Sequence, residues 1–334
     1  MAIEIDVTYH GDPAGIVAAA RNIEERGGTD GLFVPEGAHD PFVYLTLAAE
    51  HTERLRLGTS IALAFARSPM AMAYPAYDVH RLSGGRFVLG LGSQIKPHIE
   101  RRYSMPWSRP ADRMREYIAA VRAIWHTWQT GDALDFRGDF YTHTLMPPLF
   151  NPGPVPFPSP EIWLAGVGPR MVATAGAVAD GFICHPLLSR DYLADVLQPQ
   201  LEDGRASTGA TGGFTLAAMA MVATGRTEEE YADAVAGTKR QIGFYASTPA
   251  YKPVLDHHGW GDLHGEAHAF TKAGRWTELG DLVDDEVLTT LAVVGELDRV
   301  GADVRARFDG LASRVVLSIP YAADDALGLD IASS

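Results

Sequence analysis

Eight short apolar segments recur along the chain, and longer stretches with a helical pattern of apolar residues separate them. The segments are rich in β-branched residues, and most do not alternate between apolar and polar side chains. Strands of this kind are buried on both faces, as in a parallel sheet covered by helices. Eight parallel strands close a barrel, so the sequence predicts an α/β fold, the (β/α)8 or TIM barrel. The predicted strands cover residues 3–8, 31–35, 55–63, 86–91, 161–167, 181–185, 214–222 and 314–319.

Helices are expected between these strands. Residues 110–128 place apolar side chains three and four positions apart, which buries one face of a long helix. Thr227 and Glu230 form a capping box that opens another helix, and Pro75 is expected to disturb the helix over 69–82. The predicted helices cover residues 13–26, 42–51, 69–82, 110–128, 169–179, 191–202, 227–245 and 281–308.

An open, doubly wound sheet is the alternative architecture, and it usually carries a glycine-rich turn after its first strand. Here the stretch Tyr9-His10-Gly11-Asp12 contains a single glycine. The later Gly90-Leu91-Gly92 has Ile95 where a dinucleotide motif needs its third glycine. We interpret it as the end of a barrel strand, where glycine lets something flat or bulky approach the backbone closely.

The chain has 334 residues, and a barrel needs roughly 250. We therefore expect one domain over residues 1–334 that carries two insertions. Residues 135–160, after the fourth strand, are rich in proline and aromatic residues and predict an ordered surface insertion. Residues 246–280, after the seventh strand, predict a lid-like excursion.

Charge and cysteine content exclude several classes of protein. The formal net charge of −14 argues against binding to nucleic acid or to an anionic membrane. No apolar run approaches the roughly 18 residues that span a bilayer, and the acidic N-terminus does not resemble a signal peptide. The one cysteine, Cys184, allows neither an intramolecular disulfide nor a cysteine-based zinc site. We expect a cytoplasmic protein.

The strand ends of a barrel locate its active site. Here they carry small residues and few carboxylates, which suits a planar organic cofactor better than a metal. The turn Gly166-Val167-Gly168-Pro169-Arg170 follows a strand and opens a helix, so its backbone N–H groups and its arginine are suited to a phosphate. A tight turn with a surface arginine is the alternative.

Glu36 and His39 follow the second strand. His39 has the chemistry of a proton donor or acceptor near neutral pH. Equally, Asp40-Pro41 is a good helix start, which would make His39 a packed loop residue. Ser60, Ile61 and Ala62 end the third strand with room for a ring system, although ordinary barrel packing would also explain them.

His264 and His268 lie four residues apart with Glu266 between them, a spacing that resembles a zinc-binding helix. The glutamate stands at the wrong position for that motif, and Gly259, Gly261 and Gly265 disfavour a helix. A mobile lid is the preferred interpretation of this segment, and no metal site is predicted.

With these residues in place, the chain resembles the bacterial luciferase-like superfamily of flavin- and deazaflavin-dependent barrel enzymes. The resemblance covers most of the chain. It depends on the motifs LGTSIALAFARSP, SGGRFVLGLGSQ, RPADRMREYIAAVRAIW, FRGDFYTH and EIWLAGVGPRM. Within the superfamily, the chain is similar to the group that uses coenzyme F420, a deazaflavin that carries hydride.

The resemblance implies a non-prolyl cis peptide at Ser60–Ile61 behind the ring of the cofactor. It also implies ring and tail contacts at the end of the fourth strand and a phosphate on the turn that opens at Gly166. One departure concerns the Asp-His pair that several deazaflavin enzymes carry after the second strand, because His39 is displaced by one or two positions. The expected cofactor contacts are Ser60, Ile61, Ala62, Gly92, Ser93, Gln94, Gly166, Val167, Gly168 and Arg170.

The function that follows is hydride transfer between F420 and a small organic substrate. His39 and then Glu36 are the expected proton-transfer residues, and His98, Trp107 and His185 are possible substrate contacts. An FMN-dependent monooxygenase on the same scaffold is the nearest alternative; a metal-dependent hydrolase and a cofactor-binding protein without turnover are others. The expected partners are a second copy in a homodimer and a flavin or F420 reductase that supplies reduced cofactor.

Overall fold

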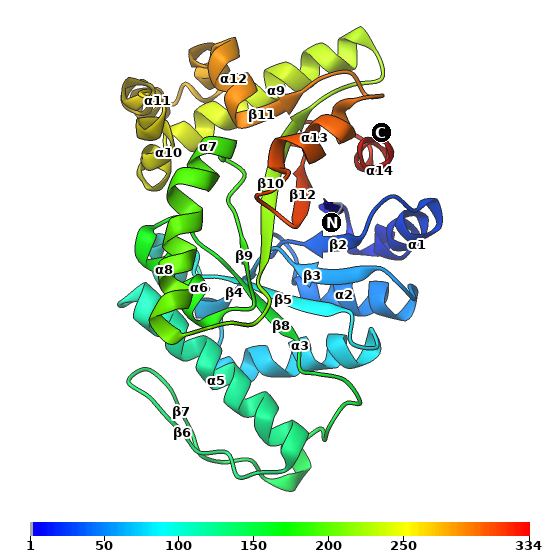
Figure 1. Ribbon diagram of the computed structural model, residues 1–334, viewed down its shortest axis with the longest axis vertical. Helices are drawn as coiled ribbons and strands as arrows, with labels where there is room; N and C mark the ends of the chain where they lie inside the picture. The colour runs from blue at the N-terminus through cyan, green and yellow to red at the C-terminus, as the bar shows by residue number, and fades with distance from the viewer. Residues whose placement is uncertain (1–2) are drawn as a thin grey trace.

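Eight parallel strands form a closed barrel in the computed structural model, which describes residues 3–334. Each strand pairs with its neighbours in the order β1-β2-β3-β5-β8-β9-β10-β12, and β12 pairs with β1 to close the ring (Figure 1). This confirms the predicted TIM barrel. The barrel strands are β1 (Glu4–Thr8), β2 (Gly31–Val34), β3 (Arg56–Thr59), β5 (Phe87–Gly92), β8 (Glu161–Ala165), β9 (Gly181–Ile183), β10 (Thr215–Ala223) and β12 (Arg314–Ser318).

The third predicted strand is interrupted, and the barrel sheet contains one further strand that was not predicted. The cis peptide bond lies at Ser60–Ile61, as the resemblance implied, and β4 (Ala62–Leu63) follows it and pairs with β5. β11 (Ala292–Val294) pairs with β10, so the prediction of helix throughout 281–308 is wrong there. Its three residues directly follow α12 (Asp285–Leu291), so no turn separates the helix from the strand and the sequence pattern does not mark where one ends and the other begins.

Helices surround the barrel, and none in the described part of the chain has both the length and the hydropathy to cross a membrane. α3 continues through Pro75, contrary to the expected disturbance. Pro75 has no N–H to donate to the carbonyl of Ala71. Ala71 is exposed, so water can donate a hydrogen bond to that carbonyl instead. The longer helices are α1 (Ile16–Arg26), α2 (Pro41–Glu50), α3 (Pro69–Leu82), α5 (Pro110–Thr130), α6 (Pro169–Val178), α8 (Gln198–Thr208), α9 (Glu228–Ala246), α11 (Gly261–Lys272), α13 (Val300–Phe308) and α14 (Asp325–Ser333). Shorter ones are α4 (Lys96–Arg101), α7 (Arg190–Tyr192) and α10 (Lys252–His257).

Side chains fill the inside of the barrel. Phe33 stacks on Trp163 with ring centroids 5.7 Å apart, and both are fully buried. Below them, at the N-terminal end of the strands, Arg314 of β12 donates to both carboxylate oxygens of Asp6 on β1, at 2.9 and 2.5 Å. The barrel is therefore plugged at that end, and the large cavity formed by the described residues lies toward the C-terminal ends of its strands.

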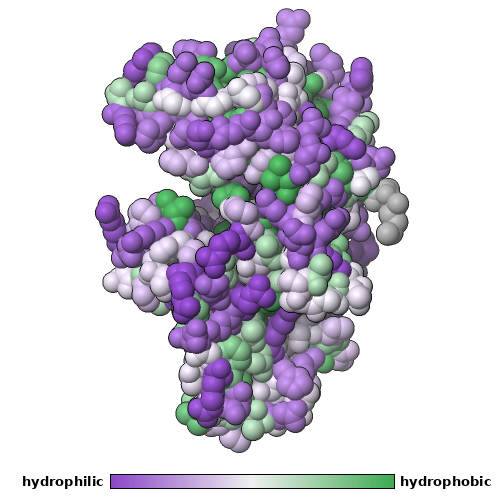
Figure 2. Space-filling view, turned by 60° about the vertical axis from the view of Figure 1, so that its left-hand side comes forward, coloured by the Kyte–Doolittle hydropathy of each residue, from purple (hydrophilic) through white to green (hydrophobic). Residues whose placement is uncertain are grey.

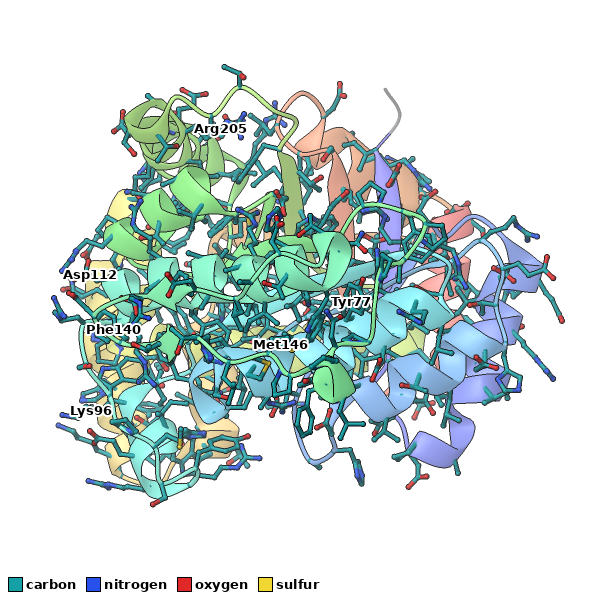
Figure 3. All side chains as sticks on the ribbon, turned by 90° about the horizontal axis from the view of Figure 1, so that it is seen from below. Tyr77, Lys96, Asp112, Phe140, Met146 and Arg205 are labelled. Carbon is teal, nitrogen blue, oxygen red and sulfur yellow. The ribbon has the colours of Figure 1, made fainter. Side chains whose placement is uncertain are left out.

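The insertion after β5 is fastened to α5, as the prediction of an ordered segment requires. Its hairpin, β6 (Phe136–Arg137) and β7 (Thr142–His143), turns around the carboxylate of Glu116, which accepts three backbone N–H bonds of 2.6–2.8 Å. Farther on, Met146 accepts a hydrogen bond from Trp128, against whose ring Tyr77 also packs; Figure 3 shows Met146 and Tyr77 close together beside α5.

The excursion after β10 is helical, so the expectation that its glycines disfavour a helix is wrong. α11 begins at Gly261, and its Gly265 is exposed, where the lost side chain costs only about 1 kcal/mol. The rings of His264 and His268 stack 5.8 Å apart. Each Nδ1 bonds to a carbonyl oxygen at the end of α9, that of Ala246 at 2.7 Å or of Ser247 at 3.2 Å. The histidine spacing is thus explained by capping of α9. Within residues 3–334 no group of three potential ligands could hold a metal ion.

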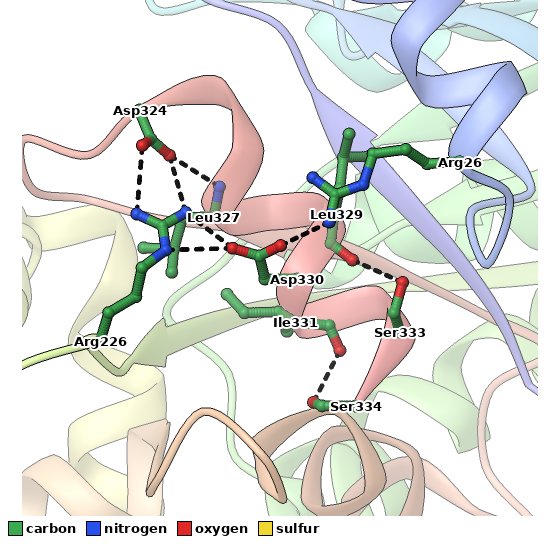
Figure 4. Close-up of polar contacts among 9 residues, drawn as sticks. All are labelled: Arg26, Arg226, Asp324, Leu327, Leu329, Asp330, Ile331, Ser333 and Ser334. Atoms are coloured by element: carbon green, nitrogen blue, oxygen red, sulfur yellow. Dashed lines mark hydrogen bonds and ion pairs between the residues drawn. The ribbon is translucent and has the colours of Figure 1, made fainter.

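The C-terminal helix α14 is tied to the rest of the molecule by one ion-pair network (Figure 4). Arg226, in the loop after β10, binds Asp324 at 3.0 Å and Asp330 at 2.7 Å. Asp330 also accepts from Arg26 of α1 at 2.6 Å. The network therefore joins three segments that lie far apart in the sequence.

We predict that Arg226→Ala lowers the free energy of unfolding by about 1 kcal/mol at pH 7. A single exposed ion pair contributes little, but Arg226 belongs to a network of several pairs. The hydrogen bond from Arg226 lowers the pKa of Asp324 below its ordinary value of 3.8. The contribution is therefore present above that value and is lost as the pH falls through the lowered pKa. Denaturant titrations at pH 7 and pH 3 should show the difference from wild type shrink. Arg21→Ala on α1, an arginine without an ion pair in the described residues, should change little at either pH.

Candidate active site

One large cavity, of about 800 Å³, opens at the C-terminal ends of β3, β5, β8, β9 and β10. Figure 2 shows this side of the molecule deeply notched below the end formed by α9–α12, with hydrophobic residues along the edges of the notch. The volume falls in the range of small-molecule and cofactor sites. Its position is the one at which barrel enzymes hold their chemistry.

The floor of the cavity is apolar. Ile61, Ala165, Ile183 and Met219 line it, and they pack directly on the side chains that fill the barrel. Ala165 and Ile183 end β8 and β9, Ile61 follows β3, and Met219 lies within β10, so closure of the barrel is what makes them neighbours. A flat, rigid ring system would cover such a surface and bury it from water.

Two glycines of β5 shape this floor. A Cβ atom on Gly90 would lie 1.9 Å from the carbonyl oxygen of Thr59, and one on Gly92 would lie 2.0 Å from Cδ1 of Ile61. The close approach that the glycines permit is thus made by the neighbouring strand of the protein itself. Gly92 gives Ile61 its place in the cavity wall.

Glu36 holds the interrupted strand from the side. Its N–H donates to the carbonyl of Ile61 at 3.0 Å, and its carboxylate accepts from the N–H of Leu63 at 2.8 Å. The other carboxylate oxygen pairs with Arg67 at 2.6 Å, and the Glu36 side chain is almost fully buried. Arg67 also reaches Asp40 at 3.4 Å. Glu36 therefore spans the segment that supplies the floor residue Ile61.

The glycine turn after β8 forms one wall, and Gly168 is the N-cap residue of α6. Arg170 lines the cavity, but its side chain is 75% exposed and pairs with Asp112 of α5 at 2.9 Å. Figure 3 shows Asp112 at the same end of the molecule as Lys96, the other cation of the cavity lining. Lys96 in turn lies 3.8 Å from Glu100 on the same helix. The rim thus offers a helix N-terminus and two cations, each of which already has a carboxylate partner.

An aromatic wall stands opposite. His185, at the end of β9, stacks on Tyr251 with centroids 4.0 Å apart and meets Tyr245 edge-on at 4.6 Å. Burial raises the pKa of Tyr245. Burial, and to a smaller extent repulsion from an ionised Tyr245, raises the pKa of Tyr251 to about 12. Both phenols therefore stay protonated at neutral pH.

Most of the residues expected to bind cofactor or substrate do line the cavity. The lining includes Ser60, Ile61, Gly92, Ser93, Gln94, Trp107, Gly166, Val167, Gly168, Arg170 and His185. Ala62 does not, because it is buried inside β4.

The two expected proton-transfer residues and His98 do not line it either. Glu36 is held in its ion pair, and His39 is exposed beside Tyr44, with ring centroids 6.1 Å apart. Asp40 accepts from the N–H of Phe42 at 2.9 Å, so the helix start at Asp40-Pro41 is confirmed, whereas His39 is an exposed loop residue and not a packed one. His98 is exposed on α4.

The sequence analysis missed Met219, Tyr245 and Tyr251 as parts of the site. Met219 lies inside β10, three residues before the end of the predicted strand, where alternation along the strand would have pointed it into the barrel. The two tyrosines lie at the end of α9 and just after it. The other site residues were predicted from their positions at the ends of predicted strands, and these two tyrosines lie far from any strand end in the sequence.

Comparison with known proteins decides the family. The profile of the luciferase-like monooxygenase family matches residues 2–314. The chain belongs to this family. An uncharacterized protein of Mycobacterium tuberculosis is 51% identical over 293 residues, which cover 87% of this chain and 86% of that protein.

Two further comparisons show which named proteins this chain is similar to. A second M. tuberculosis protein, named provisionally as a coenzyme F420-dependent oxidoreductase, is 30% identical over 308 residues, covering 86% and 84% of the two chains. The solved F420-dependent tetrahydromethanopterin reductase of Methanopyrus kandleri superposes with a TM-score of 0.78 at 19% identity, over 99% of this chain and 97% of that one. This last likeness agrees with the barrel described above.

The two glycines of β5 give a test of the cavity wall. Gly90→Ala should lower the free energy of unfolding by about 3 kcal/mol or more, because the new methyl group meets backbone that cannot move. Gly92→Ala should cost about 1–3 kcal/mol, since it meets only the flexible end of Ile61. Gly213→Ala, where the added atom meets nothing within 4 Å, is the control and should stay near wild type. Equal losses for Gly90→Ala and Gly92→Ala in thermal or denaturant unfolding would contradict this account.

Proposed function

We propose that the protein is an oxidoreductase that uses coenzyme F420 to exchange hydride with a small organic substrate. The observation that carries the proposal is the apolar-floored cavity of about 800 Å³ at the barrel mouth. Membership of the luciferase-like family supports it, as does the relative named as an F420-dependent oxidoreductase. A separate reductase would return the cofactor to its starting state.

The residues present fit a deazaflavin. Ser60 lines the cavity, and its buried Oγ has no hydrogen-bond partner in the described part of the chain. An orphaned buried hydroxyl is costly unless a ligand satisfies it. Ile61, Ala165 and Met219 would lie under the ring, and the N-terminus of α6 would face a phosphate. When bound, the deazaflavin supplies a carbon that accepts or donates hydride.

The chain itself contributes position and exclusion of water. Its apolar floor and the tyrosines above His185 desolvate one face of a bound ring, and Trp107 closes the side toward α5. None of the described residues that line the cavity is a carboxylate. Proton transfer by His39 stays a prediction, since its side chain is exposed and is not among the residues that line the cavity. Glu36, tied to Arg67 and Leu63, is better suited to hold the floor in place.

An FMN-dependent monooxygenase is the competing function, because the family takes its name from monooxygenases. Titration of the purified protein with oxidised F420 and with FMN, followed by fluorescence, separates the two. We expect F420 to bind more tightly, with no oxygen uptake when the reduced form is supplied in air. Preferential binding of FMN together with oxygen consumption would overturn the proposal.

Ser60→Ala should weaken F420 binding about fivefold, the effect of one lost hydrogen bond, while leaving the unfolding midpoint unchanged or slightly raised. Thr238→Val is the matched control. It also removes a buried, unpaired hydroxyl, but from α9 away from the cavity lining, and should leave affinity unchanged. Equal affinities for wild type and Ser60→Ala would show that this hydroxyl does not meet the cofactor.

A further inference from the structure

His185 is held in a fixed orientation at the cavity wall. It follows β9, and its ring lies between Tyr251, stacked at an interplanar angle of 24°, and Tyr245, edge-on at 73°. Together with Gly166, Val167 and Tyr251, His185 also lines a second cavity of about 20 Å³. Two aromatic neighbours on different elements leave the imidazole little freedom to turn.

One backbone contact determines which ring nitrogen carries the proton. The N–H of Leu187 donates to Nδ1 of His185 at 3.1 Å. A backbone N–H can only donate, so Nδ1 must be the unprotonated nitrogen and Nε2 must carry the hydrogen of the neutral ring. In the described part of the chain this is the one hydrogen bond of the His185 side chain. Nε2–H is therefore a donor left for a ligand.

The surroundings oppose a charged imidazolium. The groups that face His185 are the phenols of Tyr245 on α9, Tyr251 after it and Tyr192 on α7, and the thiol of Cys184 beside it. No carboxylate is present among the described residues of either cavity lining, and the two charged side chains there, Lys96 and Arg170, are both positive.

Burial acts in the same direction, because it lowers the pKa of His185 to about 3. A group whose pKa is that low stays neutral at every pH at which the protein would work. Donation from Nε2–H therefore requires no proton uptake.

We propose that His185 is a neutral hydrogen-bond donor, and no source of protons, to an oxygen acceptor of the ligand in the large cavity. This rests on the proposed function insofar as that ligand is the deazaflavin. A donor without charge favours a carbonyl or hydroxyl oxygen, and it binds equally well in acid and in neutral solution. His185 thereby favours ligands that place an acceptor oxygen opposite its Nε2–H, and proton transfer falls to another residue.

The first test needs no ligand. Imidazole ¹H–¹⁵N correlation spectra of ¹⁵N-labelled protein between pH 5 and pH 8, with His185 assigned by its loss in His185→Gln, should show an unchanging neutral ring protonated on Nε2. A titration within that range, or a proton on Nδ1, would overturn the inference whatever the cofactor proves to be.

The second test adds oxidised F420 or FMN to the same sample. Binding should move the Nε2 resonance of His185 and leave that of His80, a buried histidine outside the cavity, in place. Binding of either compound without that shift would overturn the pairing and leave the cofactor assignment intact. If neither compound binds, the proposed function and this inference fail together.

Affinity measurements complete the case. His185→Leu should weaken binding about fivefold to tenfold, by the same factor at pH 6 and pH 8, since a neutral donor is lost. His185→Gln, which retains a side-chain N–H, should lie within about threefold of wild type. An unchanged affinity in His185→Leu, or a loss confined to low pH, would contradict the inference.

Discussion

Closure of the parallel sheet is the constraint on which the rest of this structure depends. Pairing of β9 with β10, and of β12 with β1, turns a row of strands into a ring whose carboxyl ends meet at one rim. Ile61, Ala165, Ile183 and Met219 are far apart in the sequence and become a single surface only through that closure. At the opposite end, the buried pair of Asp6 and Arg314 joins the first and last barrel strands.

The polar groups around the rim fall into two sets: some stabilise the cavity wall, and others are left to bind a ligand. Glu36 and Arg67 neutralise each other and support the interrupted third strand, so their charges are already used. Ser60 and His185, in contrast, present a hydroxyl and an N–H for which the described residues provide no partner. Around the rim, satisfied groups therefore hold the cavity wall together, and unsatisfied groups in the cavity lining are left for a ligand.

The barrel and most cavity residues could be predicted because both depend on local signals. Apolar strands followed by glycine or serine mark the rim, and Ser60, Gly92 and Gly166 were found in this way. The failures have the opposite origin. α11 is stabilised by the contacts of His264 and His268 with the end of α9, and tertiary contacts of this kind override the low helix propensity of glycine.

Those two histidines also couple the aromatic wall to a more distant helix. Because they fasten α11 to the final carbonyls of α9, an outward movement of the end of α9 either takes α11 with it or breaks both hydrogen bonds. Tyr245 and Tyr251, which pack on His185, lie at and just after that end. The width of the site at this wall is therefore linked to the position of α11, none of whose described residues lines the cavity.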